Sequence, residues 1–270
     1  MTRKVRIMGV QIAPVAGNKI ENLKKTAHFI SENSWFKPDL IVLPEVFNTG
    51  VDFEKVNEYA EVIPADQTTM FLSGFAEKYS TNIIGGSFFE KCPDGKIKNT
   101  SVFFDRTGQI KGKYSKIHMF SYFGSKEGSF VTPGDSAVII DSDIGKIGLS
   151  ICYDLRFPEL YRTLAYAGAE IIVCPAAWPY PRYEHWITLT KTRALENQVF
   201  FIPVNQAGNF DKKRINIGNS MIINPWGEII SSAGGTEGVV MAEIDLEMIK
   251  KLREEFPVLN DRKLEAYKVL

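Results

Sequence analysis

Three residues with catalytic potential stand next to predicted strand ends. Cys152 lies between a β-rich stretch, 145–151, and a helix that Pro158 opens, so its thiol should be exposed at the carboxyl end of a buried strand. Glu45 ends the apolar run 39–45, and Lys116 follows a strand-like stretch that runs into an aromatic loop. Because a reactive thiolate needs a nearby base or cation, this set predicts nucleophilic catalysis.

Each of the three also has an ordinary structural interpretation. A free cysteine is commonly a small hydrophobic core residue, and a charged residue at a strand end is commonly solvated. Taken singly, Cys152, Glu45 and Lys116 therefore favour a structural role. Only their combination, drawn from three strand ends, points to one site.

Four segments of the chain stand out: Leu43-Pro44-Glu45, Tyr114-Ser115-Lys116-Ile117-His118, Cys152-Tyr153-Asp154-Leu155-Arg156-Phe157-Pro158-Glu159 and Arg193-Ala194-Leu195-Glu196-Asn197-Gln198. In this order they resemble the motifs of the nitrilase, or carbon–nitrogen hydrolase, superfamily. The resemblance covers nearly the whole chain and implies a four-layer αββα sandwich. It also implies a catalytic triad of Glu45, Lys116 and Cys152, no cofactor, and a homodimer formed through the helices beside the cysteine.

The same resemblance points to a second glutamate and to an oxyanion site. The family has a glutamate six residues before Pro-Gly-Asp, and here Pro133-Gly134-Asp135 makes that residue Glu127. Without this spacing from the family, Glu127 would be interpreted as an ordinary loop carboxylate. The implied reaction is amide hydrolysis through a thioester, with Lys116 and the backbone N–H of Tyr153 holding the oxyanion.

The amino-acid sequence around the cysteine resembles that of bacterial omega-amidases, which suggests 2-oxoglutaramate or 2-oxosuccinamate as substrate. Arg182 is the candidate for binding the substrate carboxylate, since a guanidinium can hold it with two parallel hydrogen bonds. A solvated loop arginine is the alternative, with Lys126 and Arg193 next in line. Trp178 and Tyr122 are candidate substrate-binding aromatics near the mouth of the site.

The function has open alternatives. The aromatic residues near the mouth would equally fit a bulkier amide or an N-carbamoyl compound, and another aliphatic amidase or a nitrilase is also an alternative. A catalytically silent binding module of the same fold is a further alternative, although all three triad residues are present. His118 and His185 are interpreted as structural, Cys92 as incidental and Cys174 as a core residue. The residues predicted to orient the turn after the cysteine are Asp154, Arg156, Arg193, Glu196 and Asn197.

The elements that must position these residues alternate between strands and helices. Strand 5–12, helix 18–31 and strand 39–45 form one unit, and strand 145–151, helix 158–168 and strand 170–175 repeat the order, which suggests an internal duplication. Stretches 83–89, 101–105 and 109–114 read as hairpin strands. Helix 183–198, strands 199–205, 219–223 and 239–244, and a helix from Leu246 complete the chain. No linker divides it, so one domain over residues 1–270 is expected.

Composition limits the possible partners. The chain has 270 residues, 44% hydrophobic and 24% charged, which is typical of globular proteins. Its 32 basic and 32 acidic residues give no net field to attract nucleic acid or an acidic membrane, and no apolar run is long enough to span a bilayer. The three cysteines are far apart and form no zinc-type pair. We therefore expect a cytoplasmic enzyme acting on a small amide, without a metal.

Overall fold

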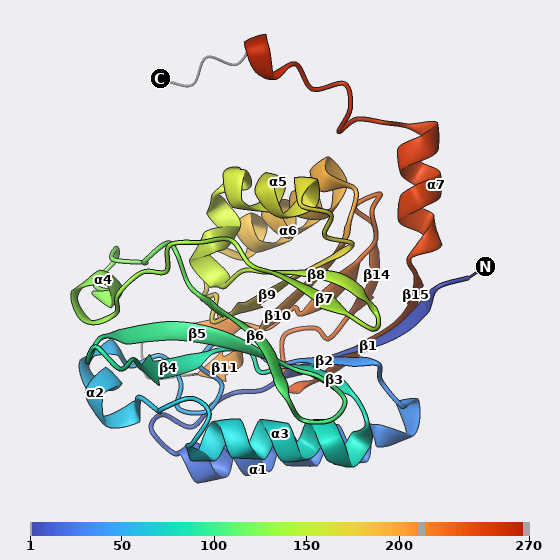
Figure 1. Ribbon diagram of the computed structural model, residues 1–270. Coiled ribbons are helices and arrows are strands. Elements are labelled where there is room, and N and C mark those ends of the chain that lie inside the picture. Colours follow the sequence, from blue (N-terminus) through green and yellow to red (C-terminus); the bar gives the residue numbers. More distant parts are fainter. Residues whose placement is uncertain (1, 210–213, 267–270) are drawn as a thin grey trace.

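The structure, a computed structural model, describes residues 2–209 and 214–266. Within these residues two large sheets are stacked face to face (Figure 1). The first has the strand order β15-β1-β2-β3-β5-β4, and β6 also pairs with β5. Its strands are β1 (Lys4–Gln11), β2 (Leu40–Val42), β3 (Asn82–Ile84), β4 (Phe88–Lys91), β5 (Ile97–Phe104), β6 (Ile110–Ser115) and β15 (Gly238–Asp245).

The second sheet has the order β14-β13-β10-β9-β8-β7. Its strands are β7 (Ile139–Ser142), β8 (Gly145–Leu149), β9 (Ile171–Ala176), β10 (Phe200–Asn205), β13 (Met221–Ile223) and β14 (Ile229–Ser232). A small separate sheet pairs β11 (Ala207–Asn209) with β12 (Ile215–Ile217).

Helices cover the outer faces of the two sheets. The α-helices are α1 (Lys19–Glu32), α2 (Val56–Tyr59), α3 (Gln67–Tyr79), α4 (Glu127–Phe130), α5 (Pro158–Tyr166), α6 (Tyr183–Asn197) and α7 (Glu247–Glu255). Short 3-10 helices are η1 (Ser34–Phe36), η2 (Phe53–Lys55), η3 (Cys152–Arg156) and η4 (Leu264–Ala266). In the described part of the chain, no helix combines the length and apolar character needed to cross a membrane.

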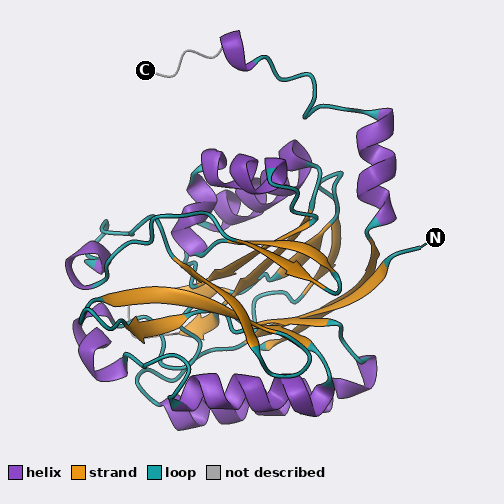
Figure 2. Cartoon of the chain, viewed as in Figure 1, coloured by secondary structure: helices purple, strands orange, loops and turns teal. Residues whose placement is uncertain are grey.

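The helices and sheets form four layers. The pair α1 and α3 lies under the first sheet, and α5 and α6 lie over the second, with both sheets between them (Figures 1 and 2). Side chains of β2 alternate between two cores: Leu40 and Val42 join the core that contains the second sheet, whereas Ile41 joins the core under α1 and α3. The expected αββα sandwich is thus confirmed.

Each sheet is built around three parallel strands that helices connect. In the first sheet β1, α1, β2, α3 and β3 follow one another, and β2 pairs in parallel with both neighbours. In the second sheet β8, α5, β9, α6 and β10 do the same. The suggested internal duplication agrees with this repeat. Parallel strands bring their carboxyl ends to one edge, and that edge carries the candidate site.

Several expected elements differ from the structure. The expected strand 39–45 is shorter, since β2 spans Leu40–Val42. The stretch 83–89 is not one strand but is split between β3 and β4, because the chain turns at Gly86, which has a φ of +54°. A Cβ there would lie 2.0 Å from the carbonyl oxygen of Pro44, so this close approach requires glycine. In addition, β5 begins at Ile97 instead of residue 101. This earlier start brings Asn99 into the sheet.

Candidate active site

The strand-to-helix turn at Cys152 has the form expected of an exposed nucleophile. Cys152 opens η3 with a φ of +46°, a strained conformation for a residue with a Cβ. The fully buried Asp154 holds the turn by accepting hydrogen bonds from the Ile151 N–H at 2.9 Å and the Tyr114 hydroxyl at 2.7 Å. Asp154 also accepts from the His118 N–H at 3.1 Å. These bonds stabilise the strained backbone.

The end of η3 is held by a second set of polar residues. The Arg193 guanidinium donates to the Leu155 carbonyl at 3.1 and 2.9 Å, and it pairs with Glu196 at 2.6 Å. Asn197 in turn donates to the Arg193 carbonyl at 3.0 Å. The contacts of Arg193, Glu196 and Asn197 agree with their expected role in orienting the turn.

Lys116, Glu45 and Glu127 form one buried charged cluster. The Lys116 Nζ lies 2.9 Å from Glu45 Oε1 and 2.9 Å from each carboxylate oxygen of Glu127. All three side chains are at most 3% exposed. Two backbone groups fix the carboxylates: the Ala177 N–H donates to Glu45 Oε2 at 2.9 Å, and the Phe120 N–H donates to Glu127 Oε2 at 2.7 Å. The structure thus brings together the residues expected at one site.

The protonation states within the cluster follow from burial and charge. Burial alone would lower the pKa of Lys116, but Glu127 and Glu45 outweigh this effect and raise its pKa well above the usual range. Burial raises the pKa of Glu127, against the pull of Lys116. Burial, with the added repulsion of Glu45, raises the pKa of Cys152 well above that of a free thiol. Cys152 therefore rests as a thiol and needs a base for attack.

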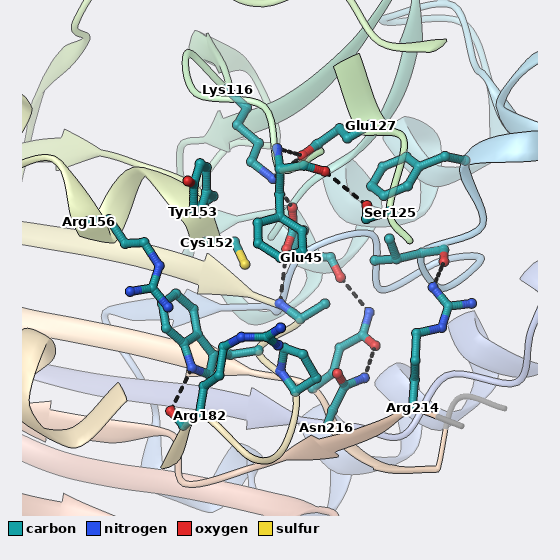
Figure 3. Close-up of a pocket in the computed structure, with 17 residues that line it drawn as sticks. Glu45, Lys116, Ser125, Glu127, Cys152, Tyr153, Arg156, Arg182, Arg214 and Asn216 are labelled. Carbon is teal, nitrogen blue, oxygen red and sulfur yellow. Dashed lines mark hydrogen bonds and ion pairs between the residues drawn. The ribbon is translucent and has the colours of Figure 1, made fainter. Parts of the chain in front are cut away.

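Cys152 and the charged cluster line one pocket, drawn in Figure 3. Lys116 and Glu127 lie at one end, Arg156 and Arg182 lie across from them, and the Cys152 sulfur points into the space between (Figure 3). The remaining lining residues come mainly from loops: Val51, Phe53, Phe120, Ser125, Tyr153, Ala177, Trp178, Pro179, Gln206, Arg214 and Asn216.

The pocket end opposite Lys116 is basic and aromatic. The Arg156 guanidinium lies 4.8 Å from the Trp178 ring centroid, and that of Arg182 lies 4.6 Å from the Phe123 ring centroid. Within the described residues neither arginine forms an ion pair with a carboxylate. Burial, together with the nearby positive charge of Arg182, lowers the pKa of Arg156. This end of the pocket is therefore suited to an anion.

The structure places two residues differently from what the sequence predicted. Arg156 was expected to orient the turn, but its guanidinium lines the pocket. Tyr122 was expected to bind substrate, but it is 58% exposed and does not line the pocket; its ring lies edge-on to Phe120 and tilted against Tyr153, which do line it. Trp178 and Arg182 do line it. Neither of the two cations considered next, Lys126 and Arg193, is among the lining residues.

The other residues weighed in the sequence lie outside the pocket. His118 stacks on Phe157 with ring centroids 3.6 Å apart and contacts Asp154 through Nδ1 at 2.7 Å. His185 contacts Arg156 at 3.2 Å. Cys174 is fully buried in the core. Across residues 2–209 and 214–266, no group of three histidine, cysteine or acidic side chains is placed to hold a metal ion.

Comparison with known proteins gives matches over nearly the full length. A family model described as carbon–nitrogen hydrolase matches residues 6–254. The omega-amidase NIT3 of Saccharomyces cerevisiae is 33% identical over 279 residues, covering 99% of this chain and 96% of that protein. The 2-oxoglutaramate amidase of Bacillus subtilis is 35% identical over 251 residues, covering 93% of this chain and 95% of that protein.

Solved structures agree with this sequence similarity. The crystal structure of Saccharomyces cerevisiae Nit3, a member of the nitrilase superfamily, aligns with a TM-score of 0.89 at 32% identity and covers 98% of this chain and 97% of that one. A carbon–nitrogen hydrolase from Helicobacter pylori aligns with a TM-score of 0.88 at 28% identity, with coverages of 98% and 97%. Both matches include the two sheets and the helices that position Cys152.

Proposed function

The chain belongs to the carbon–nitrogen hydrolase family, and on that premise we propose that it hydrolyses omega-amides of small oxo-dicarboxylic acids, such as 2-oxoglutaramate and 2-oxosuccinamate. Family membership makes it a hydrolase of carbon–nitrogen bonds. The proteins to which it is similar include an omega-amidase and a 2-oxoglutaramate amidase. The observation that carries the proposal is the pair Arg156 and Arg182 across the pocket from Lys116.

Acylation would begin with proton transfer from Cys152 to Glu45. The resting thiol is protonated, and the nearest base in the cluster is the Glu45 carboxylate. The sulfur then attacks the amide carbon, forming a carbon–sulfur bond and a tetrahedral oxyanion. When this intermediate collapses, the carbon–nitrogen bond breaks and Glu45 returns the proton to the nitrogen, so that ammonia leaves and a thioester remains on Cys152.

Lys116 and the Tyr153 N–H would stabilise the oxyanion. An ammonium group has three N–H donors, and one directed to Glu45 with one shared by the two Glu127 oxygens leaves the third for the substrate. Tyr153 is in the first turn of η3, where N–H groups have no partner inside the helix. Glu127 would keep Lys116 charged and fixed, since burial alone disfavours the charge.

Deacylation would use the same base a second time. With ammonia gone, a water next to Glu45 gives its proton to the carboxylate and attacks the thioester carbon. The carbon–sulfur bond breaks, the proton returns to the Cys152 sulfur, and the oxo-dicarboxylate leaves. The net reaction is amide plus water to acid plus ammonia.

The carboxylate at the far end of an omega-amide would bind to Arg156 and Arg182. Both guanidiniums lie against aromatic rings, which orient them, and the Nη2 of Arg156 also contacts His185, so the other N–H groups of that guanidinium can bind a carboxylate. An N-carbamoyl compound with a distant carboxylate could use the same arginines, whereas an uncharged nitrile or aliphatic amide would leave two cations unpaired in the pocket. The two arginines therefore favour an anionic substrate.

Ammonia release from matched substrates tests the proposal. We expect Arg156→Ala and Arg182→Ala each to raise the activation free energy for 2-oxoglutaramate by about 2–5 kcal/mol, because an anionic group loses its partner. The corresponding fall in kcat/KM is at least on the order of 30-fold. An uncharged short amide should lose at most a few-fold with the same variants. The measurement is initial ammonia release with both substrates for each variant.

Lys126→Ala is the matched control, since Lys126 is an exposed cation near the mouth that does not line the pocket. It should leave both substrates unaffected. Equal losses on the charged and uncharged amides would make the arginines structural. Faster turnover of N-carbamoyl compounds or nitriles than of omega-amides would favour those alternatives, and no turnover of any of them by the wild type would favour a silent binding module.

We further propose that the protein is a cytoplasmic homodimer with one domain over residues 1–270, the ends of which lie outside the described residues. The family match, which extends from residue 6 to 254, supports one domain. Apolar side chains on the outer surface of the second sheet's helices support association: Tyr166 and Leu195 are 49% and 52% exposed. Free thiols at Cys92, Cys152 and Cys174 fit a reducing compartment.

A further inference from the structure

Asn99, in β5, lies directly beside the charged cluster without lining the pocket. It is fully buried, and its Nδ2 lies 2.9 Å from Glu45 Oε1 and 3.4 Å from Glu127 Oε1. Its backbone carbonyl accepts a hydrogen bond from the Lys116 N–H at 2.9 Å. One residue thus contacts both carboxylates and the lysine.

The amide of Asn99 acts as a donor. The ionised Glu45 carboxylate can only accept hydrogen bonds, so Nδ2 must face it. Within the described residues Asn99 Oδ1 has no hydrogen-bond partner. A buried acceptor without a partner is unfavourable, so the favourable contribution of this side chain comes from its N–H groups.

The two oxygens of Glu45 have different partners. Oε1 accepts from both Lys116 and Asn99, whereas Oε2 accepts from the Ala177 N–H. Cys152 and Ala177 line the same pocket as Glu45, so Oε2, the oxygen without Lys116 and Asn99, is the one available to the thiol. The Lys116 ammonium also donates to Glu127. A second donor on Oε1, from Asn99, therefore restricts rotation of the Glu45 carboxylate more than Lys116 alone would.

From this arrangement we propose that Asn99 is a positioning residue: it occupies Oε1 of Glu45 together with Lys116 and so keeps Oε2 aimed at the Cys152 thiol as the base. The proposal rests on the proposed role of Glu45. Asn99 does not touch the substrate, because it is absent from the pocket wall. It acts through the carboxylate that does the chemistry.

This role has a consequence for turnover. The groups that face Glu45 are Lys116 at the end of β6, Glu127 in α4, the Cys152 thiol in η3 and the Asn99 amide in β5. Without the Asn99 amide, Oε1 keeps the Lys116 donor, which Glu127 also holds, so the variant should lose turnover and keep substrate binding.

The test compares Asn99→Leu with the wild type. The substitution keeps the number and branching of the side-chain heavy atoms and removes the donor, so we expect kcat to fall by about 10- to 100-fold while KM stays within a few-fold. Asn99→Ala, which leaves room for a water to replace the amide, should show the same changes at smaller size and guards against misfolding of the first variant.

Ser101→Ala is the matched control. Ser101 is two residues along the same strand and therefore on the same face as Asn99, is fully buried, and has no hydrogen-bond partner for its hydroxyl among the described residues. This variant should keep the wild-type kcat and KM. A purely structural role for Asn99 would lower the melting temperature while the folded variant kept a near wild-type kcat, and that result would overturn the proposal.

A second readout separates this proposal from the proposed substrate. The rate at which iodoacetamide alkylates Cys152, followed by mass spectrometry of the Cys152 peptide, needs no amide substrate. In Asn99→Leu this rate at neutral pH should fall several-fold, because the base that takes the thiol proton is no longer held in place. If the wild type hydrolyses no omega-amide but this fall is present, the substrate proposal fails and the positioning role remains. An unchanged alkylation rate in a folded variant contradicts the role of Asn99.

Discussion

Cys152→Ala is expected to lower kcat for amide hydrolysis by at least on the order of 10⁴-fold while the protein still folds, because the variant loses the atom that forms the covalent bond. Alanine can adopt the backbone of Cys152 no less easily than cysteine does, and the turn is held by Asp154 and Arg193. Ammonia release with 2-oxoglutaramate and thermal unfolding measure the two effects separately.

Cys92→Ala provides the comparison for this loss. Cys92 is the other partly exposed cysteine and lies outside the pocket, so its removal should leave kcat within a few-fold of the wild type. A Cys152→Ala variant that keeps more than about one-hundredth of the wild-type kcat would mean that another group carries the nucleophilic step.

Glu45→Gln is expected to lower kcat by about 10²–10⁴-fold, since the near-isosteric amide cannot accept the thiol proton. The same substitution makes the Cys152 thiol easier to ionise. Burial raises the pKa of Cys152 and the Glu45 charge raises it further, so removing that charge lowers the thiol pKa and favours thiolate. A fall in kcat therefore reports lost proton transfer. The measurement is kcat at several pH values.

The matched control for Glu45→Gln is Glu90→Gln. Glu90 is a buried glutamate that pairs with Lys113, much as Glu45 pairs with Lys116, but it does not line the pocket. Glu90→Gln should lower thermal stability and leave kcat nearly unchanged. If both glutamine variants lower kcat equally, the loss at Glu45 comes from a disturbed buried ion pair and not from catalysis.

The sequence predicts the strand ends well, and the reason is local. An apolar run followed by Pro44 and Glu45, and a β-rich stretch followed by Cys152 and Pro158, mark buried strands whose carboxyl ends carry polar residues. In the structure β2 and β8 end three residues before Glu45 and Cys152, respectively. Once both strands lie in the parallel parts of two sheets that are packed face to face, the two residues meet.

Residues that act through tertiary contacts could not be predicted in the same way. Asn99 is one polar residue in a strand that also contains threonine and serine, and only the pairing of β5 with β6 brings it next to Lys116. The turn contains both Asp154 and Arg156, but the chain directs Asp154 inward and Arg156 into the pocket. Helix α3 was not expected, since its threonines and Gly74 are poor helix formers, and packing of Leu72 and Ala76 on the first sheet overrides that preference.

The central claim is a thioester on Cys152, and acid quenching of wild-type enzyme mixed with excess 2-oxoglutaramate tests it most directly. Samples quenched across the first turnover are analysed by intact mass and by peptide mapping. The account predicts a transient adduct with the mass of the substrate less ammonia, confined to the peptide that contains Cys152 and absent from Cys152→Ala. An adduct on the peptides of Cys92 or Cys174, or a full first turnover of ammonia with no adduct at any time, would contradict it.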